Sequence, residues 1–143
     1  CIHALPAGDQ EAKRLPEAAC ISLPTWKIPL RALLVDGDMV LAGDLKGNIH
    51  HWVAEKLSES GLTFRYQGSF AAHSGIVRCL EKVGDSRFAS GGEDGKVYIW
   101  GLDSAKLLRE FERPDFVTAV RYDLGRKLLH ITGYDGDIVS RPI

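Results

Sequence analysis

Three segments of the chain repeat one pattern, and this repetition constrains the fold more than any other feature of the sequence. Each segment has a strand-like stretch of small and apolar residues, a tight turn that contains Gly, and a second short stretch with alternating apolar residues. The three segments are residues 40–52, 88–100 and 129–141. Their turn glycines are Gly47, Gly95 and Gly136, at spacings of 48 and 41 residues. Self-similarity at such a period indicates a repeat architecture.

The turns of these segments predict β-hairpins. Two of them read Asp-Gly, at 94–95 and 135–136, and the first reads Lys-Gly at 46–47. Asp-Gly between apolar runs favours a hairpin, because both residues of such a turn adopt positive φ. Further apolar stretches flank the hairpins, at 30–35, 63–70, 76–83, 106–111 and 116–122. The sequence therefore predicts an all-β chain of three consecutive four-stranded antiparallel blades, with about 11–14 short strands.

Composition and charge limit the classes of function. The chain has 143 residues, a size typical of one domain, and its 45% hydrophobic and 26% charged residues are typical of a globular protein. With 18 basic and 19 acidic residues the net charge is −1, which argues against direct binding of nucleic acid. The apolar runs are too short for a transmembrane segment. Three cysteines without a C-x-x-C pair favour a reducing, intracellular compartment, although a Cys1–Cys20 disulfide stays possible.

The residues that could carry chemistry favour structural interpretations. His50 and His51 are neighbours on a predicted strand, so their side chains point to opposite faces and cannot chelate one ion. Residues 91–96 resemble a phosphate loop, but Glu93 and Asp94 would repel phosphate, and Val97 stands where a magnesium ligand would be needed. We therefore predict no catalytic residue, no metal site and no cofactor.

The middle unit resembles the WD-repeat family of β-propellers. It carries Ala-His-Ser-Gly at 72–75, Ala-Ser-Gly-Gly-Glu-Asp-Gly at 89–95 and Val-Tyr-Ile-Trp at 97–100. The family's repeat runs from a Gly-His pair to a Trp-Asp pair; here Ala72 replaces the Gly and Gly101 replaces the terminal Asp. The resemblance implies a buried hydrogen-bonded relay of four side chains, those of His73, Ser90, Asp94 and Trp100.

The other two units depart from the pattern. In the first, Lys46 stands in place of Asp94, and Trp26 or a neighbour lies near the His position. In the third, Arg113 lies near the His position and Arg141 replaces the Trp. The resemblance covers residues 28–143, with repeats at 28–70, 71–111 and 112–143. Residues 1–27 are expected to form an N-terminal segment with a possible closing or preceding-blade strand at residues 19–23.

Three units are too few to close a propeller, which has typically 4–8 blades. We therefore expect the chain to be part of a larger ring, completed by further residues of a longer precursor or by another chain. Residues 137–143 align with the third strand of the middle unit, at 96–100, so no fourth strand follows in the last unit. The strand edges are expected to be covered by a partner or by precursor residues, since open edges invite aggregation.

The resemblance implies a non-catalytic protein–protein interaction scaffold that works within a multiprotein complex. Such a scaffold docks proteins or peptides on the loops that a stiff β-framework positions. In these loops the candidate partner-binding residues are Lys46, Glu93, Arg113, Asp115 and Tyr134. Two alternatives stay open: an architectural subunit embedded in a large assembly without an exchangeable ligand, and an enzyme with a site at the mouth of the ring.

Overall fold

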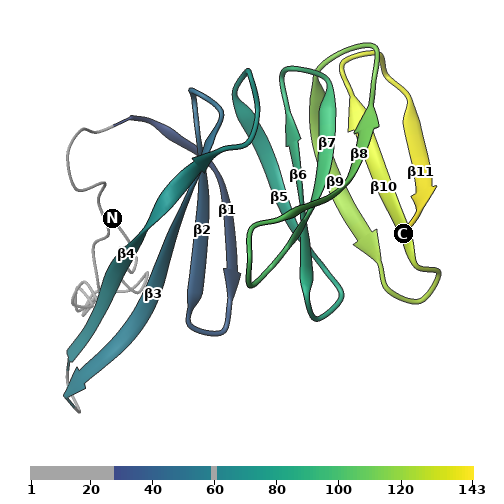
Figure 1. Ribbon diagram of the computed structural model, residues 1–143. Coiled ribbons are helices and arrows are strands. Elements are labelled where there is room, and N and C mark those ends of the chain that lie inside the picture. Colours follow the sequence, from purple (N-terminus) through teal and green to yellow (C-terminus); the bar gives the residue numbers. More distant parts are fainter. Residues whose placement is uncertain (1–27, 59–60) are drawn as a thin grey trace, which may run out of the picture.

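The computed structural model describes residues 28–58 and 61–143, which form eleven strands in three antiparallel sheets (Figure 1). The first sheet has the order β1 (Leu30–Asp36), β2 (Met39–Asp44), β3 (Asn48–Ser58), β4 (Gly61–Ala71). The second has the order β5 (Val77–Val83), β6 (Arg87–Gly92), β7 (Lys96–Gly101), β8 (Leu107–Glu112). The third has the order β9 (Val117–Asp123), β10 (Leu128–Gly133), β11 (Ile138–Pro142).

The sheets follow one another as blades, with the first strand of each sheet on the inside. These inner strands lie side by side, β1 beside β5 and β5 beside β9. The all-β prediction is confirmed, and the third sheet ends on its third strand, as the alignment of residues 137–143 indicates. The repeat boundaries at 28–70, 71–111 and 112–143 stay a prediction, and the strand expected at residues 19–23 lies outside the described residues. Within the part of the chain that the structure describes, no helix could cross a membrane.

The middle sheet is buried on both faces because its strands alternate their side chains between two neighbours. On β6, Phe88 packs towards the first sheet, whereas the next residue, Ala89, packs towards the third. On β7, Trp100 belongs to the core with the first sheet, and Val97 and Ile99 belong to the core with the third. This alternation explains why nearly continuous apolar runs in the middle unit form strands.

Five short segments meet at one end of the sheets, at the top of Figure 1. We call them the loop belt: residues 44–47, 72–76, 92–95, 113–116 and 133–136. Each segment is bonded to the next by backbone hydrogen bonds, which run from the N–H of Ala72 and His73 to Gly47 O (2.9 Å each), from Glu93 to Ile76 O (2.9 Å), from Arg113 to Gly95 O (2.7 Å) and from Tyr134 to Phe116 O (3.1 Å). The belt therefore forms one continuous surface across the three sheets.

Gly47 is the position where the belt needs glycine most strictly. Its φ is +93°, in the left-handed region that disfavours other residues. A Cβ built on Gly47 would lie 1.9 Å from the carbonyl oxygen of His73. The close approach of the two backbones is what allows Gly47 O to accept two hydrogen bonds. The Lys46-Gly47 turn therefore holds the first sheet to the second.

Replacing Gly47 by Ala should destabilise the chain more than the same change at Gly136. Both glycines have positive φ, at +93° and +81°, so both variants should lose about 1–2 kcal/mol of unfolding free energy through the backbone. Only the Cβ at position 47 would meet other atoms, which should cost about 1–3 kcal/mol more. Urea denaturation of the two variants measures the difference. Equal losses would show that the contact between Gly47 and His73 does not limit stability.

Candidate functional site

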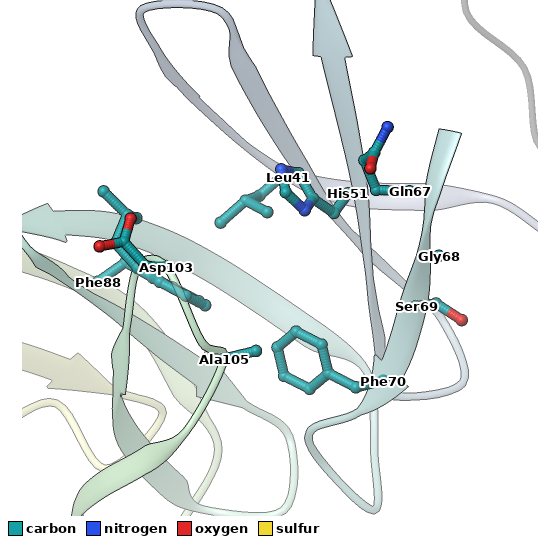
Figure 2. A pocket seen from close by; sticks show the side chains of 10 residues that line it. Leu41, His51, Gln67, Gly68, Ser69, Phe70, Phe88, Asp103 and Ala105 are labelled. Atoms are coloured by element: carbon teal, nitrogen blue, oxygen red, sulfur yellow. The ribbon is translucent and has the colours of Figure 1, made fainter. Parts of the chain in front are cut away.

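The two adjacent histidines of β3 lie in different environments. His50 is buried and bonds to Asp44 and Tyr66 of its own sheet, with Nε2 2.8 Å from Asp44 Oδ2 and Nδ1 3.0 Å from the Tyr66 hydroxyl. His51 lines a hollow of about 260 Å³ between the first and second sheets, which is also lined by Phe70 of the first sheet and Phe88 of the second (Figure 2). His51 Nε2 is buried and lacks a hydrogen-bond partner. Burial lowers the pKa of His51, so its imidazole is neutral at pH 7.

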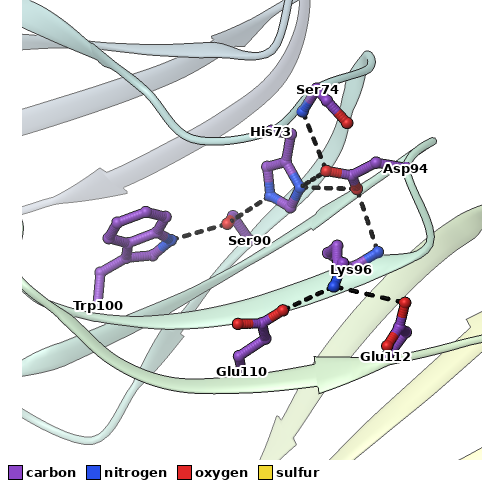
Figure 3. A network of polar contacts seen from close by, with 8 residues as sticks. All are labelled: His73, Ser74, Ser90, Asp94, Lys96, Trp100, Glu110 and Glu112. Carbon is purple, nitrogen blue, oxygen red and sulfur yellow. Dashed lines mark hydrogen bonds and ion pairs between the residues drawn. The ribbon is translucent and has the colours of Figure 1, made fainter.

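The four residues predicted as a relay in the middle unit form a continuous buried chain of hydrogen bonds (Figure 3). Trp100 Nε1 donates to Ser90 Oγ at 2.8 Å, and Ser90 Oγ lies 2.7 Å from His73 Nε2. On its other side His73 Nδ1 lies 2.9 Å from Asp94 Oδ1. Every polar group is satisfied when Nδ1 donates to the carboxylate and Ser90 donates to Nε2. Burial lowers the pKa of His73, and its contacts with Asp94 offset only part of that effect, which fits this neutral tautomer.

Asp94 also fixes the backbone around it. Its carboxylate accepts the N–H of Ser74 and the N–H of Lys96, each at 3.1 Å. The first bond reaches the segment 72–76 and the second closes the turn 92–95. One carboxylate therefore connects the relay, the β6–β7 turn and the connection from the first sheet. The side chain of Lys96 points outwards instead and pairs with Glu110 at 2.7 Å (Figure 3).

The first sheet has a polar network of its own, and it is centred on Asp44 rather than on position 46. Asp44 is fully buried and accepts the N–H of Lys46 at 2.8 Å and the N–H of Asn48 at 2.9 Å. It also accepts His50 Nε2, and the Nδ2 group of Asn48 at 3.2 Å. Burial raises the pKa of Asp44, but the hydrogen bonds from His50, Asn48 and Lys46 outweigh it and bring the pKa below its usual value.

The repeat alignment did not predict this network. Alignment on Gly47 pairs Lys46 with Asp94, but the carboxylate lies two residues earlier in the chain, at the end of β2. The side chain of Lys46 is left exposed at the turn. Trp26, expected near the His position of this unit, lies outside the described residues.

In the third sheet an arginine takes the place of the relay histidine. Arg113 Nη2 lies 2.5 Å from Asp135 Oδ2, and the two side chains are only 12% and 19% exposed. Asp135 also accepts the N–H of Asp137 at 3.0 Å, which closes the β10–β11 turn as Asp94 closes its own. The third unit thus keeps the carboxylate and replaces the neutral imidazole by a charged guanidinium.

The five candidate partner-binding residues all lie on the loop belt, but they differ in accessibility. Lys46 and Asp115 are exposed, and Tyr134 is 65% exposed. Glu93 is mostly covered and pairs with Arg78 at 2.8 Å. Arg113 points inwards to Asp135. The belt therefore offers Lys46, Asp115 and Tyr134 to solvent and uses Arg113 and Glu93 largely for internal ion pairs.

Sequence reasoning missed Phe116, which lies beside Tyr134 on the belt. The two rings are 5.5 Å apart between centroids, and Phe116 is 37% exposed. Tyr134 N–H bonds to Phe116 O as Glu93 N–H bonds to Ile76 O. The repeat alignment could have found this pair, because Phe116 and Tyr134 occupy the positions of Ile76 and Glu93.

The described residues do not gather groups in a way typical of a metal site or a nucleophile. Among residues 28–58 and 61–143, no group of three or more His, Cys, Asp or Glu side chains could hold a metal ion. Burial raises the pKa of the Cys79 thiol to about 12, so the reactive thiolate is scarce at neutral pH. Cys1 and Cys20, with their possible disulfide, lie outside the described residues. The buried ionisable groups Asp44 and His73 are already engaged in hydrogen bonds.

Comparison with known proteins identifies the repeat. The family model "WD domain, G-beta repeat" matches residues 64–101, from β4 of the first sheet through β7 of the second. The chain therefore contains a WD repeat, as the resemblance of the middle unit predicts. Its three sheets are consecutive blades of a partial β-propeller, since WD-repeat structures share the arrangement. The structures of the RRP9 WD40 repeats and of U3-55K each align with a TM-score of 0.71 at 20% identity. These alignments cover 85% of this chain and 37% and 38% of those chains.

Two curated proteins of Arabidopsis thaliana are similar in sequence to this WD-repeat chain. One is named as a non-functional target of rapamycin complex subunit LST8-2, and it is 33% identical over 93 residues. The other, Protein ROOT INITIATION DEFECTIVE 3, is 25% identical over 118 residues. The matches cover 62% and 82% of this chain but only 30% and 25% of those proteins. The chain therefore spans less than a third of the length of these two relatives.

Asp94→Ala and Asp44→Ala should both destabilise this WD-repeat chain, whereas Lys46→Ala should not. Removing either carboxylate leaves buried donors unpaired, at about 1–3 kcal/mol for each group. Lys46 contributes only its backbone N–H to the network, so its truncation should change the unfolding free energy by less than about 0.5 kcal/mol. Thermal denaturation of the three variants compares them. Equal losses at 44 and 46 would contradict the assignment of the network to Asp44.

Stability should fall as the pH falls below about 6.5, because burial lowers the pKa of both His73 and His51 in the folded chain. The unfolded chain then binds protons more strongly than the folded chain between the two pKa values. The stability that the two neutral histidines contribute is fully present above the pKa of the unfolded chain. It is lost as the pH falls towards their lowered pKa values in the folded chain. Urea denaturation between pH 7.5 and pH 5 measures this dependence. His51→Gln should flatten it in part, and a flat profile for the parent chain would contradict the argument.

Proposed function

We propose that this WD-repeat chain is a non-catalytic scaffold that binds proteins or peptides on the loop belt. The observation that carries the proposal is the contrast between the two sides of the belt. Beneath it, carboxylates and buried polar chains hold the backbone of every turn. Above it, large side chains are exposed on positions that the framework fixes. A rigid base with exposed anchors loses little conformational entropy on binding, which favours recognition.

The exposed aromatic pair of Phe116 and Tyr134 is the anchor of the proposed surface. Aromatic side chains contribute most of the binding energy in many interfaces, because they bury a large area with few rotatable bonds. Both rings sit at the end of the third sheet, and the exposed carboxylates of Asp115 and Asp137 flank them. A partner that places an apolar or cationic side chain over the exposed face of the rings fits this chemistry. Lys46 lies on the same belt over the first sheet and extends the surface.

An architectural subunit is the second candidate, and the face of β1 that points away from the second sheet favours it. Leu33 and Val35 alternate along this inner strand and are 65% and 58% exposed. Apolar side chains on one face of a strand are usually covered by a further layer of protein. A permanent neighbour on this face would make the chain a built-in part of a larger assembly. The relative named LST8-2 is described as a complex subunit, which is compatible with this role but concerns that protein.

Tyr134→Ser should abolish or strongly weaken the binding of partner proteins without loss of fold. The matched control is Leu124→Ser, since Leu124 is 69% exposed on the β9–β10 turn at the opposite end of the same sheet. Affinity purification of the tagged protein from cells, with quantitative mass spectrometry, compares the two variants with the parent chain. We expect specific partners to be depleted at least about tenfold by Tyr134→Ser only. Equal partner recovery from both variants would contradict a belt-centred interface.

A further inference from the structure

The hollow between the first and second sheets has a lining that neither the loop belt nor the relay uses. Its volume is about 260 Å³. Phe70 of β4 and Phe88 of β6 supply aromatic walls, and Ala105 of the β7–β8 loop points towards Phe70 (Figure 2). The exposed residues Gln67 and Asp103 also line the hollow, so it opens to solvent. A side chain of another molecule can therefore reach it from outside.

The imidazole of His51 brings an unpartnered polar atom to this hollow. Among residues 28–58 and 61–143, no group bonds to the buried Nε2 of His51. Buried side-chain nitrogens usually have a hydrogen-bond partner, because an unmade bond costs free energy, so an exception needs an explanation. A water molecule in the hollow would need further polar partners, which Leu41, Phe70 and Phe88 do not offer. The lining therefore favours a larger ligand that is apolar except for one polar group.

The second unit carries an apolar side chain at the equivalent position. Alignment of Gly47 with Gly95 pairs His51 of the first unit with Ile99 of the second. Ile99 is fully buried in the core between the second and third sheets. The framework thus accepts an aliphatic residue at such a joint, and an aliphatic residue would leave no polar atom unpaired. The imidazole is better explained by recognition of a ligand than by stability of the fold.

Two backbone irregularities border the hollow. The pairing of β3 with β4 shifts register between His51 and Trp52, which leaves Gln67 as the extra residue of β4. Ala105 has a φ of +52°, a conformation that residues other than Gly adopt infrequently. Bulges and strained residues are frequent beside binding sites, where they direct side chains. Both irregularities support the interpretation of the hollow as a site.

We propose that the hollow receives a tyrosine side chain of a partner protein, whose hydroxyl bonds to His51 Nε2 and whose ring packs against Phe70 and Phe88. A hydroxyl both donates and accepts, so it can pair with either neutral tautomer of the imidazole. Aromatic rings attract one another in offset and edge-to-face arrangements. The volume lies below the range of about 300–1,000 Å³ for pockets of drug-sized ligands, and it suits one large side chain. The inference rests on the proposed function in that the ligand is a protein, but its residues lie outside the belt.

A cationic or a purely apolar side chain fits the hollow less well. Among the described residues that line it, only Asp103 carries a carboxylate, and this residue is exposed to water. A cation that bonds to His51 would lose its hydration beside Phe88, which is 2% exposed, without a buried carboxylate to compensate. A phenylalanine side chain would leave His51 Nε2 unpaired. The phenol group is therefore the chemistry that the lining favours.

NMR titration of the ¹⁵N-labelled full chain with 4-methylphenol, which is the tyrosine side chain as a free molecule, tests the proposal. Toluene is the control probe, since it lacks only the hydroxyl. We expect 4-methylphenol to shift the ring-nitrogen signals of His51 and the indole N–H signal of Trp100, whose ring lies 4.9 Å from that of Phe70. Its affinity should exceed that of toluene by about three- to tenfold, as expected for one hydrogen bond. A capped Gly-Gly-Tyr-Gly-Gly peptide should shift the same signals.

Two variants separate the hydrogen bond from the space of the hollow. His51→Leu should bind 4-methylphenol and toluene with affinities within about twofold of each other, because the hydroxyl loses its partner. Ala105→Leu should weaken both probes by about fivefold or more, because the larger side chain occupies the space beside Phe70. Ala71→Leu is the matched control, since Ala71 is exposed at the end of β4 and lies outside the lining. It should change neither affinity by more than about twofold.

Thermal denaturation verifies that each variant is folded; if Ala105→Leu fails to fold, His51→Leu decides alone. The absence of a saturable shift with either probe would overturn the site. Equal affinities of the parent chain for both probes, or a preference for 4-methylphenol that persists in His51→Leu, would overturn the role of His51. Binding of 4-methylphenol without binding of the Tyr peptide would overturn a protein side chain as the ligand. Tyr134→Ser should keep both affinities, so failure of the belt interface and failure of the hollow are read from different variants.

Discussion

A carboxylate at the end of the second strand of each sheet, or in the turn that follows it, is the constraint on which the rest of this structure depends. In every sheet an aspartate accepts the backbone N–H two residues further on: Asp44 from Lys46, Asp94 from Lys96 and Asp135 from Asp137. The same carboxylates hold the side chains that reach across from neighbouring strands or connections. Backbone donors at a tight turn are thereby satisfied without water. The loop belt has a defined shape because each of its turns is held in this way.

The side chain that bonds to the turn carboxylate differs among the three sheets. The middle sheet uses a neutral imidazole that passes its hydrogen bonds on to Ser90 and Trp100, so the relay extends deep into the core. The first sheet uses His50 from β3 and ends on the Tyr66 hydroxyl. The third sheet uses a guanidinium, whose charge remains close to the surface. In the first two arrangements the imidazole is buried, and each imidazole lies beside an aromatic ring.

The sequence predicted those features that depend on short spacing. Gly95 and Gly136 with their preceding aspartates indicated the hairpins, and the residues between His73 and Trp100 indicated the middle network. The role of Asp44 was not predicted, because the alignment on Gly47 pairs Lys46 with Asp94. A carboxylate two residues earlier in the chain can accept hydrogen bonds from the same turn. The inward orientation of Arg113 depends on Asp135, which is distant in sequence. The contact between Phe116 and Tyr134 arises only when the segments 113–116 and 133–136 meet in the folded chain.

The family match from residue 64 to residue 101 begins on the outermost strand of one sheet and ends on the third strand of the next. The sequence repeat is therefore offset by one strand from the four-stranded sheet. Because of this offset, every copy of the sequence repeat spans the joint between two neighbouring blades. A duplication that adds one copy inside an array adds one such joint, and the sheets on both sides of it are completed by neighbouring copies. Propellers built from this unit can thus grow by whole copies inside a ring, whereas a lone copy lacks the fourth strand of its own sheet.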